Sequence, residues 1–354
     1  MLTKAQQTEH YLRNAIRRGR WMPGDKMPGE YELIEELGVS RATLRDALNV
    51  LSTEGMIIRK SGSGTYLSDE IATGTIAIMA NAEALASKEG YVHHRLWAEA
   101  RQLIESAGYR AVLAVGSGNY TEDIISSMDM FDNLSSSNLI GVLNAIAIGP
   151  LERELSRRGI PSVTMGGAAP NSTYCAWTDH EIATSLATTE MLSHGITDFA
   201  IMHFELPNDK FCEPNKLITS ALQHRAVHNR MDRLIPVRWS ADAEDAYTQF
   251  IEWWKRPNRP DTMFFYDDSI CDVACQAILE LGINIPNDLK VIVLTPAGRR
   301  FPISVELTRV EFDSSETAAA AWGILHQLIR GLPVSEPMIS IKATVSPGGS
   351  LGSV

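Results

Sequence analysis

The sequence predicts an α/β protein in which a small helical domain precedes two α/β lobes. Up to about Leu67 the chain contains short helices and turns, and from Gly74 onward apolar strand-like runs alternate with longer helical patterns. Such alternation is typical of parallel sheets that are covered by helices on both faces. About 280 residues of this pattern exceed one compact core, which favours two lobes over one. The predicted domains are residues 1–68 and 75–354, joined by a short polar linker at 69–74.

The predicted strands are apolar runs that end at small or polar residues. They are TIAIMA (75–80), RAVLAVG (110–116), LIGVLNAIAIG (139–149), PSVTMG (161–166), FAIMHF (199–204), LIPVRW (234–239), TMFFYDD (262–268) and KVIVLT (290–295). Most of them are separated by one helix-sized segment, such as 95–108 or 181–195. This order predicts β-α-β units rather than separate blocks of strands and helices.

Charge is distributed unevenly along the chain. The whole protein has a formal net charge of −11, which by itself argues against nucleic-acid binding. Residues 1–67, however, hold ten Lys or Arg against eight Asp or Glu, so the acidity belongs to the larger C-terminal part. A DNA-binding role for the small N-terminal domain is therefore compatible with the composition.

Composition also bears on location and on bound metals. The longest weakly polar run, at 139–149, is far shorter than the ~20 residues that span a bilayer, and the N-terminus lacks the apolar core of a signal peptide. We expect a cytoplasmic protein with no membrane partner. The four cysteines show no C-x-x-C spacing, and no other motif indicates a metal or a cofactor, so we expect neither.

The stretch ELGVSRATLRDALNVL (36–51) predicts an unusual amphipathic helix. Leu44, Ala47, Leu48 and Leu51 recur at helical spacing, and Ser40 is a suitable N-cap. Two arginines, Arg41 and Arg45, then lie in the first turns on the outer side. Cations at the start of a helix oppose its dipole, so helix stability does not explain them. Binding of an external anion would explain these two arginines.

The flanking residues place this helix in a DNA-binding motif. EYELIEEL (30–37) predicts a short helix that ends at Gly38, before the helix that Ser40 begins. A helix, a turn with glycine and a second helix is the pattern of a helix-turn-helix, whose second helix enters the major groove. IIRKSGSGTYL (57–67) then predicts a hairpin, with Arg59 and Lys60 beside its tip and suited to phosphate or minor-groove contact.

Over its whole length, AIRRGRWMPGDKMPGEYELIEELGVSRATLRDALNVLSTEGMIIRKSGSGTYL resembles the GntR-type winged helix-turn-helix, including PGDKMP, SRATLRDAL and the G-x-G-T wing. The resemblance implies DNA contact through Arg41, Thr43 and Arg45, and through Gly62 and Ser63 at the wing tip. Tyr31 stands where the family usually has Arg, which implies an altered DNA contact at this position.

The C-terminal part resembles the effector domain of LacI/GalR-type repressors, which is similar to periplasmic sugar-binding proteins. The resemblance is carried by RRGIPSV (157–163), by 178–202 and above all by RPDTMFFYDDSICDVACQAILELGINIPNDLKVIVL (259–294), with LTRV (307–310) as the strand that returns toward the hinge. Fusions of the two domains are similar to arabinose-responsive repressors. The resemblance implies two lobes joined by crossing strands, with a small ligand bound between them.

Candidate effector residues follow from the same resemblance. Asp179, Trp239 and Asp267 match ligand-facing positions, Asn81 follows the first strand, and Trp177 lies near a strand end. Carboxylates suit sugar hydroxyls and aromatic rings suit the sugar C–H surface. Core packing is an equal alternative for either Trp, and Asp268 fits a helix N-cap. Two usual sugar contacts are absent, because LTPAG (294–298) replaces the family's Gly-Phe-Asp-Asp and Pro214 replaces an Arg.

These features predict a DNA-binding transcription regulator, with repressor favoured over activator. It would bind a pseudo-palindromic double-stranded operator as a homodimer and respond to a small-molecule effector, with a sugar as the favoured class. One alternative is a constitutive DNA-binding dimer with a degenerate sensor, which the two missing contacts favour. The other is an α/β enzyme, against which the lack of a catalytic motif argues, so no catalytic residue is assigned.

Overall fold

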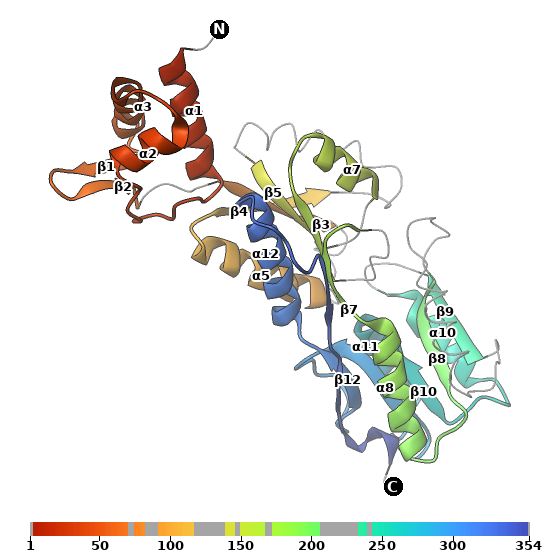
Figure 1. Cartoon of the computed structure of the whole chain (residues 1–354). Helices are drawn as coiled ribbons and strands as arrows, with labels where there is room; N and C mark the ends of the chain where they lie inside the picture. Colours follow the sequence, from red (N-terminus) through yellow and green to blue (C-terminus); the bar gives the residue numbers. More distant parts are fainter. Residues whose placement is uncertain are drawn as a thin grey trace.

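The computed structural model describes residues 3–69, 74–81, 91–116, 139–145, 149–166, 172–205, 233–238 and 243–352. An N-terminal domain stands at one end of an elongated molecule and two α/β lobes follow it (Figure 1). Among these residues, each lobe is built on its own sheet of six strands. This arrangement confirms the predicted fold class.

The N-terminal domain (residues 3–69) is a three-helix unit with a two-stranded wing. Its elements are α1 (Lys4–Arg17), α2 (Glu30–Leu37), α3 (Arg41–Thr53), β1 (Ile57–Lys60) and β2 (Gly64–Leu67). The wing strands pair antiparallel. A separate small core holds them together, with Leu12, Ile16, Leu33, Leu44, Leu48 and Leu51 all at 1% exposure or less.

Lobe 1 is an all-parallel sheet in the order β13-β7-β6-β5-β3-β4. Its strands are β3 (Thr75–Asn81), β4 (Arg110–Gly116), β5 (Leu139–Asn144), β6 (Ser162–Met165), β7 (Cys175–Thr178) and β13 (Met338–Ile341). Helices α5 (Tyr91–Ser106) and α12 (Ser314–Ile329) pack on one face, and α7 (Gly149–Arg157) packs on the other. The helices thus bury both faces, as apolar parallel strands require.

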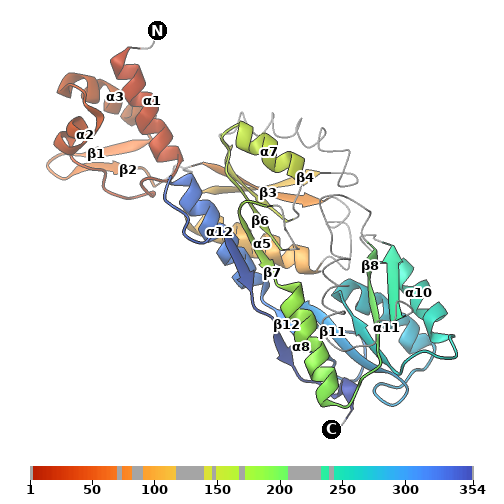
Figure 2. The same cartoon turned by 45° about the vertical axis from the view of Figure 1, so that its right-hand side comes forward.

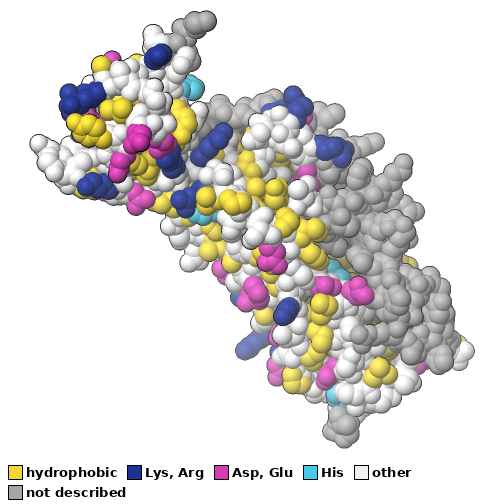
Figure 3. All heavy atoms as spheres, in the orientation of Figure 1, with side chains coloured by type: hydrophobic (Ala, Val, Ile, Leu, Met, Phe, Trp, Pro, Cys, Tyr) yellow, Lys and Arg dark blue, Asp and Glu magenta, His cyan; other side chains and the backbone are white. Residues whose placement is uncertain are grey.

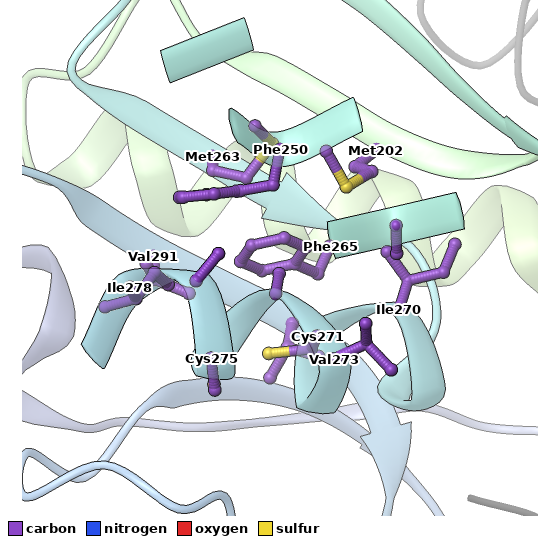
Figure 4. Packing of buried hydrophobic residues seen from close by; sticks show 14 of the residues in the cluster. Met202, Phe250, Met263, Phe265, Ile270, Cys271, Val273, Cys275, Ile278 and Val291 are labelled. Carbon is purple, nitrogen blue, oxygen red and sulfur yellow. The ribbon is translucent and has the colours of Figure 1, made fainter. Parts of the chain in front are cut away.

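Lobe 2 contains the second sheet, in the order β14-β12-β11-β10-β8-β9, with only β14 antiparallel among these strands. Its strands are β8 (Ala200–Glu205), β9 (Leu234–Arg238), β10 (Thr262–Phe265), β11 (Lys290–Pro296), β12 (Thr308–Phe312) and β14 (Thr344–Ser346). Helices α10 (Asp245–Trp254) and α11 (Asp268–Glu280) cover one face, where Phe265 packs among apolar side chains of α10 and α11 (Figure 4). Helix α8 (His180–Ser193) covers the other face, and a short 3-10 turn (Gly349–Leu351) packs beside β11.

The chain crosses between the lobes three times within the described residues. It leaves lobe 1 after β7 at Asp179, returns after β12 at Asp313, and leaves again between β13 and β14 at residues 342–343. These crossings confirm the expectation of lobes joined by crossing strands. Because each crossing is a few residues long, the lobes can hinge about this narrow waist.

The structure differs from the sequence prediction mainly at short strands. The predicted runs do not include β7, β13 and β14, which have four, four and three residues. Of these three, only β7 is implied by the sequence, through Trp177 near a strand end. Strands this short show too little periodicity to be recognised, and pairing with neighbours fixes them. The strand predicted at 139–149 ends at Asn144. Residues 70–73 of the predicted linker lie outside the described residues.

Candidate DNA-binding surface and effector site

Local capping places the α3 arginines on the surface. Gly38 ends α2 in the left-handed region at φ 61°, which glycine adopts without strain, and Ser40 accepts a hydrogen bond from the Thr43 backbone N–H at 3.1 Å. The predicted stripe of Leu44, Ala47, Leu48 and Leu51 is buried. The Arg41 and Arg45 side chains, at 57% and 53% exposure, therefore project from the outer side of α3.

A single carboxylate connects three exposed arginines. Glu30, the first residue of α2, lies 2.7 Å from Arg59 on the wing, 3.5 Å from Arg45 and 3.6 Å from Arg41. Arg59 also donates to the side-chain oxygen of Asn49 on α3, at 3.0 Å. Glu30 thus draws α2, α3 and the wing into one basic surface. The sequence analysis did not identify Glu30, because only the fold brings residues 30 and 59 together.

The wing tip and Tyr31 flank this basic surface. Gly62 has φ 71° in the turn, and the Ser63 hydroxyl lies 2.8 Å from that of Tyr66. Tyr31 is 76% exposed, and its ring centroid lies 5.7 Å from the Arg41 guanidinium. Tyr31 therefore supports Arg41 by a cation–π contact, in place of the arginine that the family usually carries.

Figure 3 shows Lys and Arg side chains (dark blue) over α3 and over the wing. Of the predicted DNA contacts, Arg41, Arg45, Gly62 and Ser63 are exposed there. Thr43 differs, because its hydroxyl lies 2.8 Å from the Ser40 hydroxyl inside the helix cap. The helix cap therefore explains the presence of Thr43 without a contact to DNA.

The first predicted effector residue lies at the lobe boundary. Asp179 is the first crossing between the lobes and caps α8, accepting from the Ile182 backbone N–H at 3.0 Å. Its second oxygen lies 3.4 Å from the Ser340 hydroxyl of β13. Asp179 therefore connects the first crossing to the strand that leads into the third.

Asp267 follows β10 at the carboxyl end of the lobe 2 sheet. It is the N-cap of α11 and accepts hydrogen bonds from both the backbone N–H and the hydroxyl of Ser269. The interpretation of Asp268 as the cap is wrong, because Asp268 is the first helical residue and is buried, with one carboxylate oxygen lacking a hydrogen-bond partner. Burial raises the pKa of Asp268 well above its ordinary value, and the charge of Asp267 adds to this effect.

Asp179 and Asp267 converge on His180. The His180 ring stacks on Tyr266 at 5.6 Å between centroids, and its Nδ1 is buried without a hydrogen-bond partner. Burial lowers the pKa of His180, while the charges of Asp267 and Asp179 oppose that shift. Burial also raises the pKa of Tyr266 to about 12. The structure thus brings two predicted residues, 88 positions apart, around one aromatic pair.

A polar group at the end of β5 was missed by the sequence analysis. Asn144 is 1% exposed, and neither its side-chain nitrogen nor its oxygen has a hydrogen-bond partner. Thr164 on β6 is its register partner, and Thr164 and Ser172 both donate to the Glu152 carboxylate, at 3.0 and 2.6 Å. A buried, unsatisfied amide at the carboxyl end of a parallel strand suits a ligand contact. An asparagine inside an otherwise apolar run is the signal that could have indicated it.

The remaining predicted effector residues are only partly placed. Trp177 lies on β7 with its side chain partly exposed, opposite Ser340 of β13. Asn81 ends β3, but its side chain lies outside the described part, as does all of Trp239. Among the described residues no group of His, Cys, Asp or Glu is arranged to hold a metal ion, and none of the helices there could span a bilayer.

Two family models match this chain. Residues 4–67 match the gntR family of bacterial regulatory proteins, and residues 188–351 match the periplasmic binding protein-like domain. The chain is a GntR-type DNA-binding regulator with a periplasmic-binding-protein-like effector domain. The first match covers the winged domain, and the second covers lobe 2 from within α8 together with α12 and β13 of lobe 1.

One similar protein covers most of this GntR-type regulator, and another covers its winged domain. The arabinose metabolism transcriptional repressor of Geobacillus stearothermophilus is 23% identical over 343 residues, which are 93% of this chain and 92% of that protein. Over the winged domain, the histidine utilization repressor of Klebsiella aerogenes is 41% identical over 54 residues, which are 15% of this chain and 22% of that protein.

Solved structures share the fold of the lobes. The transcription regulator CcpA of Lactococcus lactis has a TM-score of 0.61 and 15% identity, covering 78% of this chain and 98% of that one. A LacI family regulator from Arthrobacter sp. FB24, solved with lactose, has a TM-score of 0.61 and 14% identity, covering 79% and 100%. These neighbours confirm the LacI-like two-sheet architecture.

Proposed function

We propose that this regulator is a cytoplasmic, non-catalytic repressor that binds a pseudo-palindromic operator as a homodimer and responds to a sugar. The observation that carries DNA binding is the Glu30-centred surface, where Arg41, Arg45 and Arg59 from α3 and the wing share one exposed face. Guanidinium groups so placed can pair with guanine edges and phosphates. Two copies held at fixed spacing would multiply the modest affinity of one winged domain.

The effector site that we propose lies between the lobes and includes Asp179, Asp267, His180 and Asn144. Two carboxylates can accept hydrogen bonds from sugar hydroxyls, and the buried Asn144 amide offers both a donor and an acceptor. Asp179 stands at a crossing between the lobes, so a ligand bound there would contact the hinge itself. Ligand binding shifts the hinge only by its differential affinity for the two states, commonly about 1–3 kcal/mol.

The decisive experiment combines thermal unfolding with operator binding in the full chain. L-arabinose, other pentoses, hexoses, sugar acids and phosphorylated sugars are tested singly, L-arabinose first because of the similar arabinose repressor. An effector at ~100 times its Kd stabilises the native state by about 2.7 kcal/mol and weakens operator binding. Asp267→Ala should abolish both effects. If no compound changes either quantity, sugar control is refuted.

Asn144→Leu separates a ligand contact from a structural role. Replacing an unsatisfied buried amide by an apolar side chain of similar size should raise the free energy of unfolding by about 1 kcal/mol. The same change should abolish the sugar-induced shift. Thr189→Val, which removes an exposed hydroxyl of α8, is the control that should keep the sugar response. A variant that is destabilised yet still responds would show that Asn144 only supports packing.

One observation favours a constitutive DNA-binding dimer as a second candidate. At the LTPAG segment, where the family carries a sugar-binding carboxylate, the Ala297 carbonyl accepts a hydrogen bond from Arg95 Nη1 of lobe 1 at 2.9 Å. The two lobes are thus joined at this point by the protein itself. Operator affinity that does not respond to any compound of the panel, in a chain that still binds DNA, would support this candidate.

A further inference from the structure

The N-terminal domain contacts lobe 1 through the backbone at the end of α1. Gly19 follows α1 with φ 70°, and a Cβ placed on it would lie 1.6 Å from the Tyr109 hydroxyl oxygen of lobe 1. The same hydroxyl lies 3.5 Å from the carbonyl oxygen of Arg18. Tyr109 is 3% exposed, so the N-terminal domain and its own lobe enclose it. Only glycine at position 19 permits this close approach.

Two further contacts show the same tight fit. A Cβ on Gly108 of lobe 1 would lie 2.9 Å from Pro23 Cδ, and one on Gly74 would lie 2.8 Å from the Arg17 carbonyl oxygen. Met22 packs against the core of lobe 1. The N-terminal domain therefore meets lobe 1 at several points around residues 17–23, in addition to its covalent connection. Several contacts fix an orientation, which one flexible linker cannot do.

Aromatic rings on α12 pack against Tyr109 and so support its contact with the N-terminal domain. Tyr109 packs edge-on against Trp322 and His326, with centroids 5.6 and 5.7 Å away. Trp322 and His326 stack on each other at 5.1 Å with an interplanar angle of 13°. Large rings with few rotatable bonds make a stiff support. We call Gly74, Gly108, Tyr109, Trp322 and His326 the docking surface.

Helix α12 connects the docking surface to the hinge. It begins directly after Asp313, the second crossing, which caps it by accepting from the Ser315 backbone N–H at 2.8 Å. Its 16 residues span about 24 Å. Figures 1 and 2 both show α12 (blue) running from the waist between the lobes to the side of lobe 1 that faces the N-terminal domain.

We propose that the docking surface is an intramolecular interaction site that holds the DNA-binding domain in one orientation on lobe 1. Hinge motion at Asp313 then moves lobe 1, α12 and the DNA-binding domain as one body. In a dimer, the separation of the two winged domains would follow lobe movement rather than linker length. The regulatory consequence rests on the proposed function, whereas the rigid joint itself does not.

The first test measures the joint without DNA or effector. Cys175, Cys271 and Cys275 are buried, and every protein in this test also carries Cys212→Ser. Spin labels at Ser61→Cys on the wing and Arg101→Cys on α5, in full chains diluted with unlabelled protein, then report one distance by pulsed electron–electron double resonance. The wild type should give one narrow distribution, and Gly19→Ala should broaden it at least twofold. Gly55→Ala is the matched control, because Gly55 ends α3 at φ 72° with no atom within 4 Å of its Cβ position.

Two further variants keep the test independent of strain inside the N-terminal domain. Tyr109→Ala changes only lobe 1 and should also broaden the distribution, whereas Tyr109→Phe keeps the ring and should leave it narrow. A broad wild-type distribution, or equal narrow distributions for Gly19→Ala, Gly55→Ala and Tyr109→Ala, would overturn the proposal. Unfolding of the N-terminal domain is followed in each variant to confirm that the domain stays folded.

The second test asks whether the joint sets half-site spacing. Wild type and Gly55→Ala should prefer one spacing over operators lengthened or shortened by one or two base pairs. Gly19→Ala should lower this preference by roughly tenfold or more. The reason is that a winged domain held in a fixed orientation has a high effective concentration at the second half-site of one spacing only. An unchanged preference in Gly19→Ala would contradict the proposal. A wild type that binds no DNA would refute the proposed function instead, and the distance measurement would still stand.

Discussion

The DNA-binding surface is formed by residues close together in the sequence, whereas the effector site is formed by residues far apart in it. Glu30, Arg41, Arg45 and Arg59 lie within thirty positions, and two helices, one turn and a hairpin bring them together. Asn144 and Asp267, by contrast, are 123 positions apart and lie on different lobes. The first site depends on local geometry and the second on how two sheets are joined. Sequence patterns therefore identify the first far better than the second.

The two sites also differ in how their polar groups are solvated. The arginines of α3 are more than half exposed and share the Glu30 carboxylate. The effector site holds buried atoms without hydrogen-bond partners, on Asn144 and His180. Exposed cations favour an extended anion such as DNA, whose bound counterions they displace. Buried unsatisfied groups favour a small ligand that completes their hydrogen bonds.

The largest expected effect is on the free energy of unfolding, and it shows whether the N-terminal domain and the lobes are separate folding units. Leu48→Ala removes a side chain that is 1% exposed in the N-terminal core and should cost about 2–5 kcal/mol. Calorimetry should show a lower unfolding temperature for the N-terminal domain only. Phe264→Ala, in the core of lobe 2, is the matched change and should move only the transition of the lobes. One transition that moves with both variants would contradict the separation.

The next effect concerns the DNA-binding surface. Arg45→Ala should weaken specific operator binding by about 1–3 kcal/mol, because a bidentate base contact is lost. Fluorescence anisotropy titrations against specific and random DNA measure this change. Arg101→Ala removes an arginine of lobe 1 that is also more than half exposed and should leave affinity unchanged. Unaltered operator affinity of Arg45→Ala would remove Arg45 from the interface.

A smaller effect should appear in the pH dependence of stability. Burial lowers the pKa of His180 below its ordinary 6.5 in the folded state, against the charges of Asp267 and Asp179. Its contribution to stability is therefore complete above pH 6.5 and is lost as the pH falls through the folded pKa. For one proton, the free energy of unfolding cannot change by more than about 1.4 kcal/mol per pH unit.

His180→Gln should accordingly show a smaller fall in Tm between pH 7.5 and pH 5.5 than the wild type. Burial also lowers the pKa of His326, so part of the acid sensitivity should persist in this variant. Equal falls in Tm for both proteins would show that His180 is not protonated differently on unfolding.

The smallest effect is expected at Tyr31. Tyr31→Ala removes a cation–π contact with Arg41 and should weaken operator binding by about 0.5–1 kcal/mol. Tyr31→Arg restores the residue usual in the family and should steepen the salt dependence by about one phosphate contact. Binding titrations at several salt concentrations distinguish the two outcomes. A salt dependence that is identical in all three proteins would place Tyr31 away from DNA.

The sequence by itself determined the N-terminal domain in detail. Gly38, Ser40 and the apolar stripe of α3 fix a helix-turn-helix through contacts between residues three or four apart, so the exposure of Arg41 and Arg45 follows directly. The alternation of apolar runs and helical segments likewise indicated most of the strands and the two lobes. Periodicity of 2 or 3.6 residues needs no knowledge of distant partners.

Only the tertiary structure decided how distant residues combine. The short strands β7 and β13 are fixed by sheet pairing, β7 with β6 and β13 with β7, and the second pairing brings Ser340 to Asp179. Burial, rather than residue type, separates Asp268 from the cap Asp267, and the meeting of Gly19 with Tyr109 depends on two domains docking. The contacts of Ser340 with Asp179 and of Gly19 with Tyr109 depend on loop closure and packing over 161 and 90 positions, which local periodicity does not encode.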